Sequence, residues 1–306
     1  MSASAASPAT ATARIGVAAG LAAYGTWGLL PLYIKTLADV PSVEFLAHRI
    51  VWSVPTLVVL LTLLRGWGSV RRVFSSPRRV ILTLCATAVL ITSNWLAYIY
   101  TVNSGRILQA SLGYFINPLI SVLFGFLFLH ETMTRRQWVA IAFAAAGVSF
   151  LVVRVGMVPV LSLTLALTFA SYGLLRKTIS VDGYSGLFFE TLLMLPLFLG
   201  YLLWLGWQGS GAFGTGSPAR DGWLLFGGPI TAIPLALFGV AVQRVRLATI
   251  GLMQYVTPTS QFLLAVLVYG EDFSSNHMAA FSLIWTGLLI YSLPRNLLEK
   301  FGLSVR

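Results

Sequence analysis

Residues 107–128 read ILQASLGYFINPLISVLFGFLF, a run of 22 residues that contains no charged side chain and carries Pro118 near its centre. About 20 apolar residues are enough for an α-helix to cross the hydrocarbon core of a bilayer. At about 1.5 Å per residue, Pro118 lies roughly 16 Å into such a helix, close to the midplane of a core about 30 Å thick. The stretch therefore predicts a transmembrane helix with a proline at its middle.

The same pattern returns 140 residues later as ATIGLMQYVTPTSQFLLAVLVY, residues 248–269, where Pro258 takes the place of Pro118. The shift of 140 also superposes Arg106 on Arg246, Leu112 on Leu252, Leu123 on Leu263, Leu127 on Leu267, Glu131 on Glu271, Ala140 on Ala280 and Gly147 on Gly287. Shifts of 139 and 146 align Thr92, Leu96 and Ala97 with Thr231, Leu235 and Ala236, and Glu44 with Glu190. The chain is therefore built from two copies of one unit.

The whole chain shares the apolar character of this unit. Of its 306 residues, 57% are hydrophobic and 9% are charged, and the mean hydropathy is +0.84, whereas soluble domains carry roughly a quarter charged residues. This composition excludes an ordinary soluble enzyme. Cys85 is the single cysteine, which with three histidines argues against a disulfide and a Cys/His metal site. No lysine follows a glycine, so there is no Walker A loop, and we expect neither metal nor cofactor.

Apolar runs bounded by charge, proline or glycine predict ten transmembrane helices, at 15–34, 43–64, 80–102, 107–128, 137–153, 158–176, 184–206, 222–242, 248–269 and 277–294. Because five is odd, the second copy enters the membrane from the opposite side. The predicted fold is thus an all-α integral membrane protein of two inverted five-helix repeats. We expect a disordered cytoplasmic tail at 1–13, repeats at 14–154 and 155–294, a cytoplasmic tail at 295–306, and a flexible external loop at 208–222.

The cations predict the orientation of these helices. One set of alternate loops, together with both tails, holds 15 of the 20 Lys and Arg residues, and the other set holds four. Cytoplasmic loops carry the excess of positive charge, so both termini are predicted to be cytoplasmic. The pairs Arg71-Arg72 and Arg78-Arg79 are interpreted as topogenic charges facing lipid headgroups, in preference to a nucleic-acid site.

Four motifs resemble one known family. They are EFLAHRIVWS at 44–53, NWLAYIYTVN at 94–103, ASLGYFINPL at 110–119 and LMQYVTPTSQFL at 252–263. Together these motifs resemble the RarD branch of the drug/metabolite transporter superfamily, and the likeness extends from about residue 14 to about residue 294. The resemblance implies two EamA-type repeats and a place in the bacterial inner membrane. It also implies relatives that export amino acids and other metabolites, and its name is tied to chloramphenicol sensitivity.

Among the side chains within the predicted spans, the candidates for a charge-carrying role are Glu44, His48, Arg49 and Glu190. Such groups are costly in a bilayer and are functional by default. One interpretation is that Glu190 or the Glu44/His48 pair takes up a proton during transport, since histidine changes charge near neutral pH. The other is that Arg49 pairs permanently with Glu44 or with backbone carbonyls and stabilises the fold. The sequence leaves both open.

Polar and aromatic side chains at matching depths predict a substrate cavity. These candidates are Asn94, Trp95, Tyr98, Tyr114, Asn117, Gln254, Tyr255 and Gln261, together with an aromatic wall of Tyr24, Trp27 and Tyr172. The wall suits a flat, amphipathic or cationic ligand. Polar residues also join helices to one another, so each of them is open to a structural role. Helix 222–242 has Ile233, Pro234 and Leu237 where helix 80–102 has Asn94, Trp95 and Tyr98, so we expect the earlier helix to dominate substrate selection.

Three prolines are candidate hinges: Pro118, Pro258 and Pro234. A proline within a helix frees a carbonyl from its backbone hydrogen bond and bends the helix. The matched pair, Pro118 and Pro258, marks either a cavity near the midplane or a kink that only shapes packing. Glu131 and Glu271 fall just past the matched helices 107–128 and 248–269. Three roles are open for them: to cap a helix end, to gate the transport path, or to be solvated loop carboxylates.

These features predict a secondary active transporter that exports small amino-acid-like metabolites or amphipathic drugs by alternating access, either as a proton-linked exporter or as a uniporter. A passive channel or facilitator and a membrane receptor that transports nothing are the alternatives. The predicted partners are a small-molecule substrate, membrane lipid and protons, without nucleic acid, for a monomer or a homodimer. An integral-membrane enzyme is disfavoured because the sequence offers no metal cluster and no nucleophilic triad.

Overall fold

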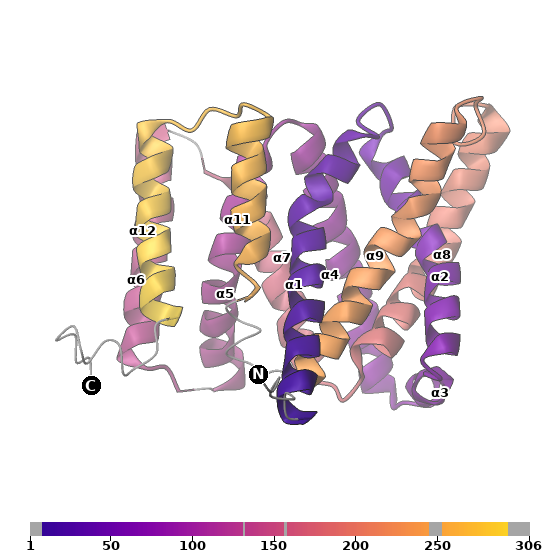
Figure 1. The fold of residues 1–306 in the computed structure, drawn as a ribbon, viewed down its shortest axis with the longest axis horizontal. Coiled ribbons are helices and arrows are strands. Elements are labelled where there is room, and N and C mark those ends of the chain that lie inside the picture. Colours follow the sequence, from indigo (N-terminus) through magenta and orange to yellow (C-terminus); the bar gives the residue numbers. More distant parts are fainter. Residues whose placement is uncertain (1–7, 131, 156–157, 245–252, 293–306) are drawn as a thin grey trace, which may run out of the picture. The chain divides into compact units, whose positions relative to one another are not determined.

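The computed structural model describes residues 8–130, 132–155, 158–244 and 253–292, and every regular element in those ranges is helical (Figure 1). In chain order the elements are α1 (Pro8–Lys35), α2 (Ser42–Leu63), α3 (Trp67–Phe74), α4 (Arg78–Asn103), α5 (Ile107–Leu129), α6 (Arg135–Val155), α7 (Val160–Lys177), α8 (Gly183–Gln208), α9 (Pro218–Arg244), α11 (Val256–Leu263), the π-helix η1 (Leu264–Val268) and α12 (Ser275–Ser292). Seven of them, α1, α2, α4, α5, α6, α8 and α9, contain a segment long and apolar enough to cross a membrane.

Most predicted helix ends lie within a few residues of the observed ones, and the largest difference is at the N-terminus. Helix α1 begins at Pro8, so residues 8–13 of the predicted disordered tail are helical. Proline is favoured in the first turn of a helix and alanine is the best helix former, which explains the extension through an Ala-rich segment. Residues 1–7, Glu131, residues 245–252 and the predicted tail at 295–306 lie outside the described residues.

Helix α3 has no counterpart among the predicted helices, because its eight residues are too few and too basic to form an apolar run. It is amphipathic. Val70 and Val73 are buried, while Arg71 and Arg72 are exposed. The ring of Trp67 packs edge-on against Phe188 of α8, with centroids 5.7 Å apart. A short helix can therefore form in the α2–α4 connection because α8 covers its apolar face.

The helices assemble into two compact units, and each unit draws on both halves of the sequence. Unit 1 comprises residues up to 89 and residues 179–260, and unit 2 comprises residues 90–178 and residues from 261 onward. The division falls within α4 and within α11. Unit 1 therefore contains α1, α2, α3, α8 and α9, and unit 2 contains α5, α6, α7 and α12.

In unit 1, α9 packs against both α1 and α2 (Figure 1). Two consecutive glycines make the approach to α2 possible. A Cβ added at Gly228 would collide with the main-chain carbonyl of Trp52, and one added at Gly227 would lie 3.1 Å from Cγ of Arg49. Small residues allow such close backbone approach between membrane helices. The glycines thus bring α9 beside the charged segment of α2.

In unit 2, α6 lies beside α12 through a reciprocal pair of close contacts (Figure 1). A Cβ added at Gly147 would lie 2.8 Å from the carbonyl oxygen of Ala280, and one added at Gly287 would lie 2.7 Å from that of Ala140. The earlier residue of each helix meets the later residue of the other, so the two helices are antiparallel. Helices α5 and α7 form the other large contact of this unit, where Gly113 faces the backbone of Ser162.

The predicted helix 248–269 is interrupted in its described part. Gln254 and Tyr255 form a turn, α11 begins at Val256, and the helix widens into η1 at Leu264. Pro258 is consequently the third residue of α11, whereas Pro118 lies inside the unbroken α5. The expectation of one continuous helix is wrong for this segment. Prolines are well tolerated in the first turn, where their missing N–H has no helical partner to lose.

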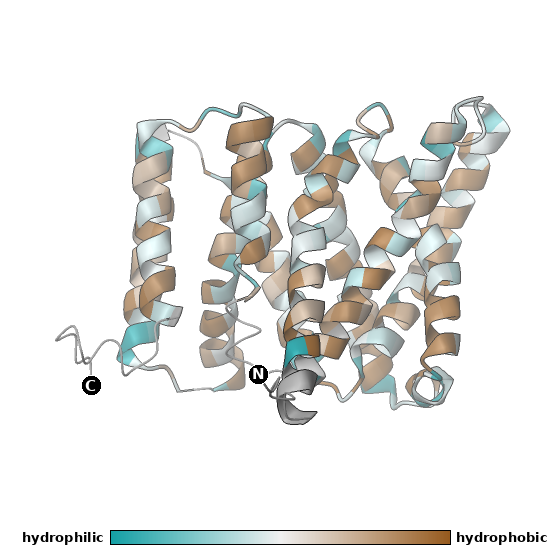
Figure 2. Cartoon of the chain, in the orientation of Figure 1, coloured by the Kyte–Doolittle hydropathy of each residue, from teal (hydrophilic) through white to brown (hydrophobic). Residues whose placement is uncertain are grey.

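The long helices consist largely of apolar residues, and hydrophilic residues concentrate towards helix ends and connections (Figure 2). Many large hydrophobic side chains are exposed, among them Leu63, Val153, Leu203 and Trp207. So many exposed large hydrophobic side chains are unusual for a water-soluble protein and normal for helices that face lipid. With the seven apolar helices, they identify a multi-pass membrane protein.

Candidate functional site

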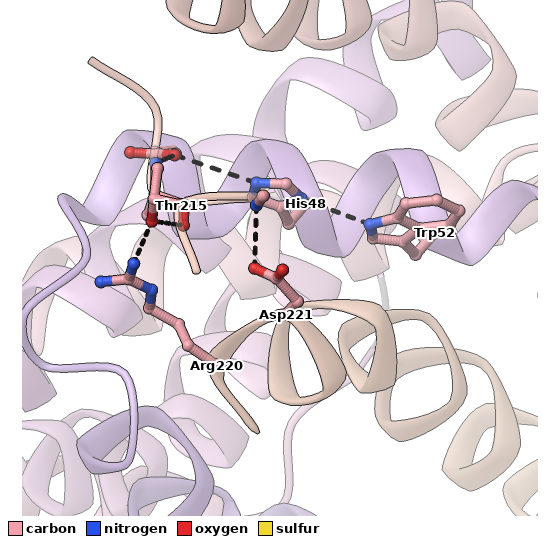
Figure 3. Close-up of polar contacts among 8 residues, drawn as sticks. His48, Trp52, Thr215, Arg220 and Asp221 are labelled. Atoms are coloured by element: carbon pink, nitrogen blue, oxygen red, sulfur yellow. Dashed lines mark hydrogen bonds and ion pairs between the residues drawn. The ribbon is translucent and has the colours of Figure 1, made fainter. Parts of the chain in front are cut away.

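A buried cluster of charged and titratable side chains occupies the start of α2 in unit 1. Glu44, His48 and Arg49 are 2%, 3% and 4% exposed. Nε2 of His48 lies 3.9 Å from Oε1 of Glu44, and Nε1 of Trp52 donates a 3.3 Å hydrogen bond to Nδ1 of His48 (Figure 3). Because Nδ1 accepts this bond, the proton of a neutral His48 ring resides on Nε2, the nitrogen that faces Glu44.

The connection between α8 and α9, residues 209–217, closes over this cluster. The backbone N–H of Ala212 donates a 2.5 Å hydrogen bond to Oε1 of Glu44. The ring of Phe213 packs on His48 and on Trp52, with centroid distances of 5.4 and 6.1 Å. We expected a flexible external loop across 208–222, whereas Gln208 ends α8, Pro218 begins α9, and the residues between them make specific contacts.

Arg49 joins α2 to α9. Its Nε donates a 3.1 Å hydrogen bond to the hydroxyl of Thr231, which in turn donates to the carbonyl of Gly227 at 2.7 Å. Thr231 is 3% exposed, so this bond lies in the interior of unit 1. The contact favours a structural contribution from Arg49, because its guanidinium is held by a neighbouring helix.

Glu190 lies on α8, also in unit 1, and is 1% exposed. Its Oε1 is 2.7 Å from the hydroxyl of Thr87 on α4, which is fully buried. Glu190 stands in the second turn of α8, whereas the loop that contacts Glu44 follows the last residue of that helix. With about 1.5 Å per residue along α8, the two carboxylates lie near opposite ends of unit 1, roughly 25 Å apart along the helix.

The aromatic wall is partly assembled. In unit 1 the rings of Tyr24, Trp27 and Phe238 form a triangle with centroid distances of 5.4 to 5.9 Å. Thr257 fixes the backbone of this segment by donating a 2.8 Å hydrogen bond to the carbonyl of Tyr24. Tyr172, the third predicted member, belongs to unit 2, where it packs against a neighbouring ring of its own helix. The structure therefore joins Tyr24 and Trp27 and adds Phe238, which the sequence did not single out.

Asn94 connects α4 to α7 in unit 2. Its Nδ2 donates to the carbonyl of Leu165 at 2.9 Å and to the hydroxyl of Thr168 at 2.8 Å, and the side chain is 1% exposed. A side-chain amide that bonds to the main chain of another helix holds the two helices together. Asn94 thus has a clear packing role, and Thr168 is a partner that sequence reasoning missed.

Tyr98, Tyr114 and Gln261 meet in unit 2. Nε2 of Gln261 donates a 2.9 Å hydrogen bond to the hydroxyl of Tyr98, and the rings of Tyr98 and Tyr114 contact edge to face at 5.7 Å. Asn117, one turn beyond Tyr114 on α5, is 2% exposed, and its Oδ1 has no hydrogen-bond partner among the described residues. A buried acceptor without a partner is costly, and a bound ligand is one way to satisfy it.

The remaining candidate residues lie in three separate segments of the chain. Trp95 is half-buried on α4, Gln254 and Tyr255 are half-buried in the turn before α11, and Pro234 is buried in α9. Thr87, Thr168 and Thr231 were missed because a threonine in an apolar helix commonly bonds to its own helix. Thr191 does so here, with the carbonyl of Leu187 at 2.9 Å. The repeat alignment of Thr231 with Thr92 was the one available signal.

The sequence of the chain is similar to those of named transporters. Residues 14–153 match the EamA-like transporter family. An uncharacterized transporter of Vibrio cholerae serotype O1 is 45% identical over 280 residues, which cover 92% of each chain. Protein RarD of Salmonella typhi is 42% identical over 278 residues, 91% of this chain and 94% of that protein. A protein of known crystal structure, 18% identical, superposes with a TM-score of 0.57 over 92% of this chain and 96% of its own, which is a likeness of fold alone.

Proposed function

Because the chain belongs to the RarD family of EamA-type transporters, we propose that it is a secondary active transporter that moves small organic solutes across the bacterial inner membrane by alternating access. The proposed substrates are amino-acid-like metabolites or amphipathic drugs, the proposed direction is export, and the proposed coupling ion is the proton. The family and the names of its members indicate a transporter rather than an enzyme.

The reciprocal contact of α6 and α12 supports an inverted repeat. Gly147 meets Ala280 and Gly287 meets Ala140, and adding or subtracting 140 converts one contact into the other. Two antiparallel helices that exchange equivalent contacts are related by a local two-fold axis. We propose that this axis relates the repeats 14–154 and 155–294, as in transporters whose halves rock against each other.

Contacts within each unit support the proposed alternation of loops. In unit 1, Arg220 forms a 3.2 Å ion pair with Asp39, so the α1–α2 and α8–α9 connections lie at the same end. In unit 2, the carboxylate of Glu271 accepts hydrogen bonds from the N–H groups of Ile107 and Leu108 at 2.6 and 2.8 Å. This contact joins the connection after η1 to the start of α5. With the positive charge gathered on the other set of loops, we propose that these ends are external and that both termini are cytoplasmic.

For the substrate site we propose the polar cluster of unit 2. The observation that carries the proposal is the buried Oδ1 of Asn117, which has no partner among the described residues, on the same helix as Tyr114 of the Tyr98–Gln261 cluster. A ligand with an N–H or O–H donor would satisfy this oxygen, and the rings of Tyr98 and Tyr114 would contact its apolar part. Ammonium groups of amino-acid-like solutes and hydroxyl groups of amphipathic drugs meet that description.

For coupling we propose Glu190 and the Glu44/His48 pair. The repeat relates Glu44 to Glu190, and the two buried carboxylates lie near opposite ends of unit 1. Groups that titrate at opposite ends of a transporter can load a proton on one side and release it on the other. Repeat symmetry does not extend to their partners, since Glu44 accepts from a loop N–H and Glu190 contacts a helix hydroxyl.

Transport by the purified protein in liposomes tests the proposal. We expect saturable uptake, counterflow from vesicles preloaded with substrate, and accumulation that follows an imposed pH gradient. Glu190→Gln should retain counterflow and lose the dependence on the gradient, whereas exchange of the exposed Asp272 for Asn should change neither. A flux that never saturates and shows no counterflow would indicate a channel. The absence of any flux for ligands that bind would indicate a receptor.

A further inference from the structure

The connection between α8 and α9 combines conformational freedom with specific anchoring. Gly209, Gly214 and Gly216 have φ angles of +67°, +77° and +88°, a region that glycine enters without a steric penalty. The turns at both ends of the segment therefore rely on glycine. No regular hydrogen-bonded structure covers residues 210–217, so side chains and isolated backbone groups determine where the segment lies.

The first anchor is the Glu44–His48 pair. Besides the hydrogen bond from Ala212 to Glu44 and the packing of Phe213 on His48, a Cβ added at Gly211 would lie 3.6 Å from Oε1 of Glu44. It would also lie 3.4 Å from Cβ of Leu205, which is 8% exposed. The segment thus covers both the carboxylate and the last turn of α8.

The second anchor is the start of α9. The N–H of Gly214 donates a 3.0 Å hydrogen bond to Asp221, and Arg220 donates to the hydroxyl of Thr215 (Figure 3). Arg220 also forms an ion pair with Asp39. These side chains are partly exposed, so water competes with them for hydrogen bonds and weakens them. The buried contact with Glu44 is the stronger of the two anchors.

We propose that residues 209–217 form a gate over the Glu44–His48 pair, and that the hydrogen bond from Ala212 to the ionised Glu44 holds this gate closed. A hydrogen bond to a charged acceptor is about twice as strong as one between neutral groups, so protonation of Glu44 weakens the latch and lets the segment lift. The gate rests on the proposed function in one respect, because it assigns Glu44 a proton during the cycle.

Other charged and titratable groups lie around the hydrogen bond from Ala212 to Glu44 and influence how this bond responds to protonation. They are His48 and Arg49 on α2, Tyr201 on α8, Arg220 and Asp221 on α9, and Asp39 in the α1–α2 connection. A proton that arrives on Nδ1 of His48, in place of the hydrogen bond from Trp52, adds positive charge beside Glu44 and opposes release of the segment. The gate therefore opens when the added proton resides on Glu44.

Accessibility of a cysteine beneath the segment tests the gate. In a Cys85→Ser background, Leu205→Cys places a thiol under Gly211, and Trp207→Cys places one on the 87% exposed surface of the same helix. Labelling by a charged maleimide is measured on the full chain in detergent, without substrate or gradient. We expect Glu44→Gln to raise the labelling rate of Leu205→Cys about tenfold, the ratio that corresponds to a lost charged hydrogen bond, and to leave Trp207→Cys unchanged.

A second variant removes the donor and keeps the carboxylate. Ala212→Pro eliminates the N–H that Glu44 accepts, so it should raise labelling of Leu205→Cys as Glu44→Gln does, and the two changes together should add nothing further. Glu190→Gln, the repeat-related exchange, should have no effect. The ratio of labelling at Leu205→Cys to that at Trp207→Cys should rise as pH falls, and this rise should vanish in Glu44→Gln.

Several outcomes would overturn the gate. One is a rate at Leu205→Cys that neither Glu44→Gln nor Ala212→Pro raises, which would make the segment a fixed cap. Another is equal acceleration at Trp207→Cys, which would mean that the end of α8 unfolds. A response to Glu44→Gln that Ala212→Pro fails to reproduce would also exclude the latch. Because labelling needs no transport, a gate that opens in a protein whose flux ignores the pH gradient would refute the coupling proposal alone.

Discussion

The hydroxyl of Thr87 lies 2.7 Å from Oε1 of Glu190 and 3.0 Å from the carbonyl oxygen of Leu84, one turn earlier in its own helix. This position serves both protonation states of the carboxyl group. When Glu190 is ionised, Thr87 donates its proton to the carboxylate. When Glu190 is protonated, the acid donates to the Thr87 oxygen, and the hydroxyl proton rotates to the carbonyl of Leu84. A single threonine can therefore satisfy Glu190 before and after it titrates.

Replacement of Thr87 should accordingly affect coupling more than folding. Thr87→Val keeps the shape and removes both hydrogen bonds, and we expect uptake driven by a pH gradient to fall about tenfold while counterflow persists. Thr87→Ser should stay close to the wild-type rate. Thr191→Val is the matched control, since Thr191 is buried on α8 but bonds to the carbonyl of Leu187 in its own helix. Undiminished gradient-driven uptake by Thr87→Val would contradict this role.

The glycines between α6 and α12 should be intolerant of a single methyl group. Gly147→Ala and Gly287→Ala each place a Cβ within 2.8 Å of a main-chain oxygen, which cannot move without shifting a helix. Overpacking of this kind costs about 1–3 kcal/mol, and we expect the midpoint of thermal unfolding in detergent to fall for both variants. At Gly200 of α8 no atom lies within 4 Å of an added Cβ, so Gly200→Ala should be neutral or stabilising. Equal midpoints for all three variants would argue against the close contact.

The carboxylate of Glu271 should stabilise unit 2 by capping α5. The residue before that helix, Arg106, provides no side-chain cap, and Glu271 instead accepts from the first two N–H groups of the helix. Glu271→Ala leaves these donors unsatisfied at the positive end of the helix dipole and should reduce stability by about 1–2 kcal/mol. The effect is measured as a lower unfolding midpoint. Asp272→Ala, at an exposed position, should leave the midpoint unchanged.

Ligand binding should depend on α4 more than on α9. Tyr98→Phe and Gln261→Leu each break the buried hydrogen bond between Tyr98 and Gln261 in unit 2. We expect each substitution to raise the dissociation constant of a bound ligand about tenfold. Leu237 occupies the position in α9 that the repeat equates with Tyr98, but it packs against the apolar cluster around Tyr24. Leu237→Ala should therefore leave affinity nearly intact. A thermal-shift titration with amino acids and amphenicols provides the measurement, and equal losses from both helices would refute the asymmetry.

The long helices were predictable because each is an apolar run that ends in charge, proline or glycine. Local chemistry explains the remainder. Helix α3 was not predicted because its stability comes from burial against Phe188 and Phe189. These residues lie more than 100 positions away in the sequence, so no local pattern reveals the contact. The turn at Gln254 was not predicted because the turn and the helix after it are equally apolar. The helical start of α1 was not predicted because its Ala-rich composition resembles that of a disordered tail.

The candidate site was predictable in its charges and less so in its partners. A buried Glu44 or Glu190 stands out because membrane spans rarely hold carboxylates. Their contacts come from residues with no such signature: the backbone of Ala212, the ring of Phe213 and the hydroxyl of Thr87. A backbone N–H is present at every residue except proline, so sequence alone gives no indication of which one a carboxylate will contact.

The pairing of α6 with α12 has a consequence for synthesis. About 120 residues separate the end of α6 from the start of α12, and at about 5–20 residues per second a ribosome needs roughly 6–24 s to make them. During that interval the face of α6 that carries Ala140 and Gly147 has no α12 to pack against. Lipid, an insertion factor or another nascent chain must cover this face in the meantime. In a polypeptide that stops before α12, the face stays exposed, and it distinguishes incomplete chains from complete ones.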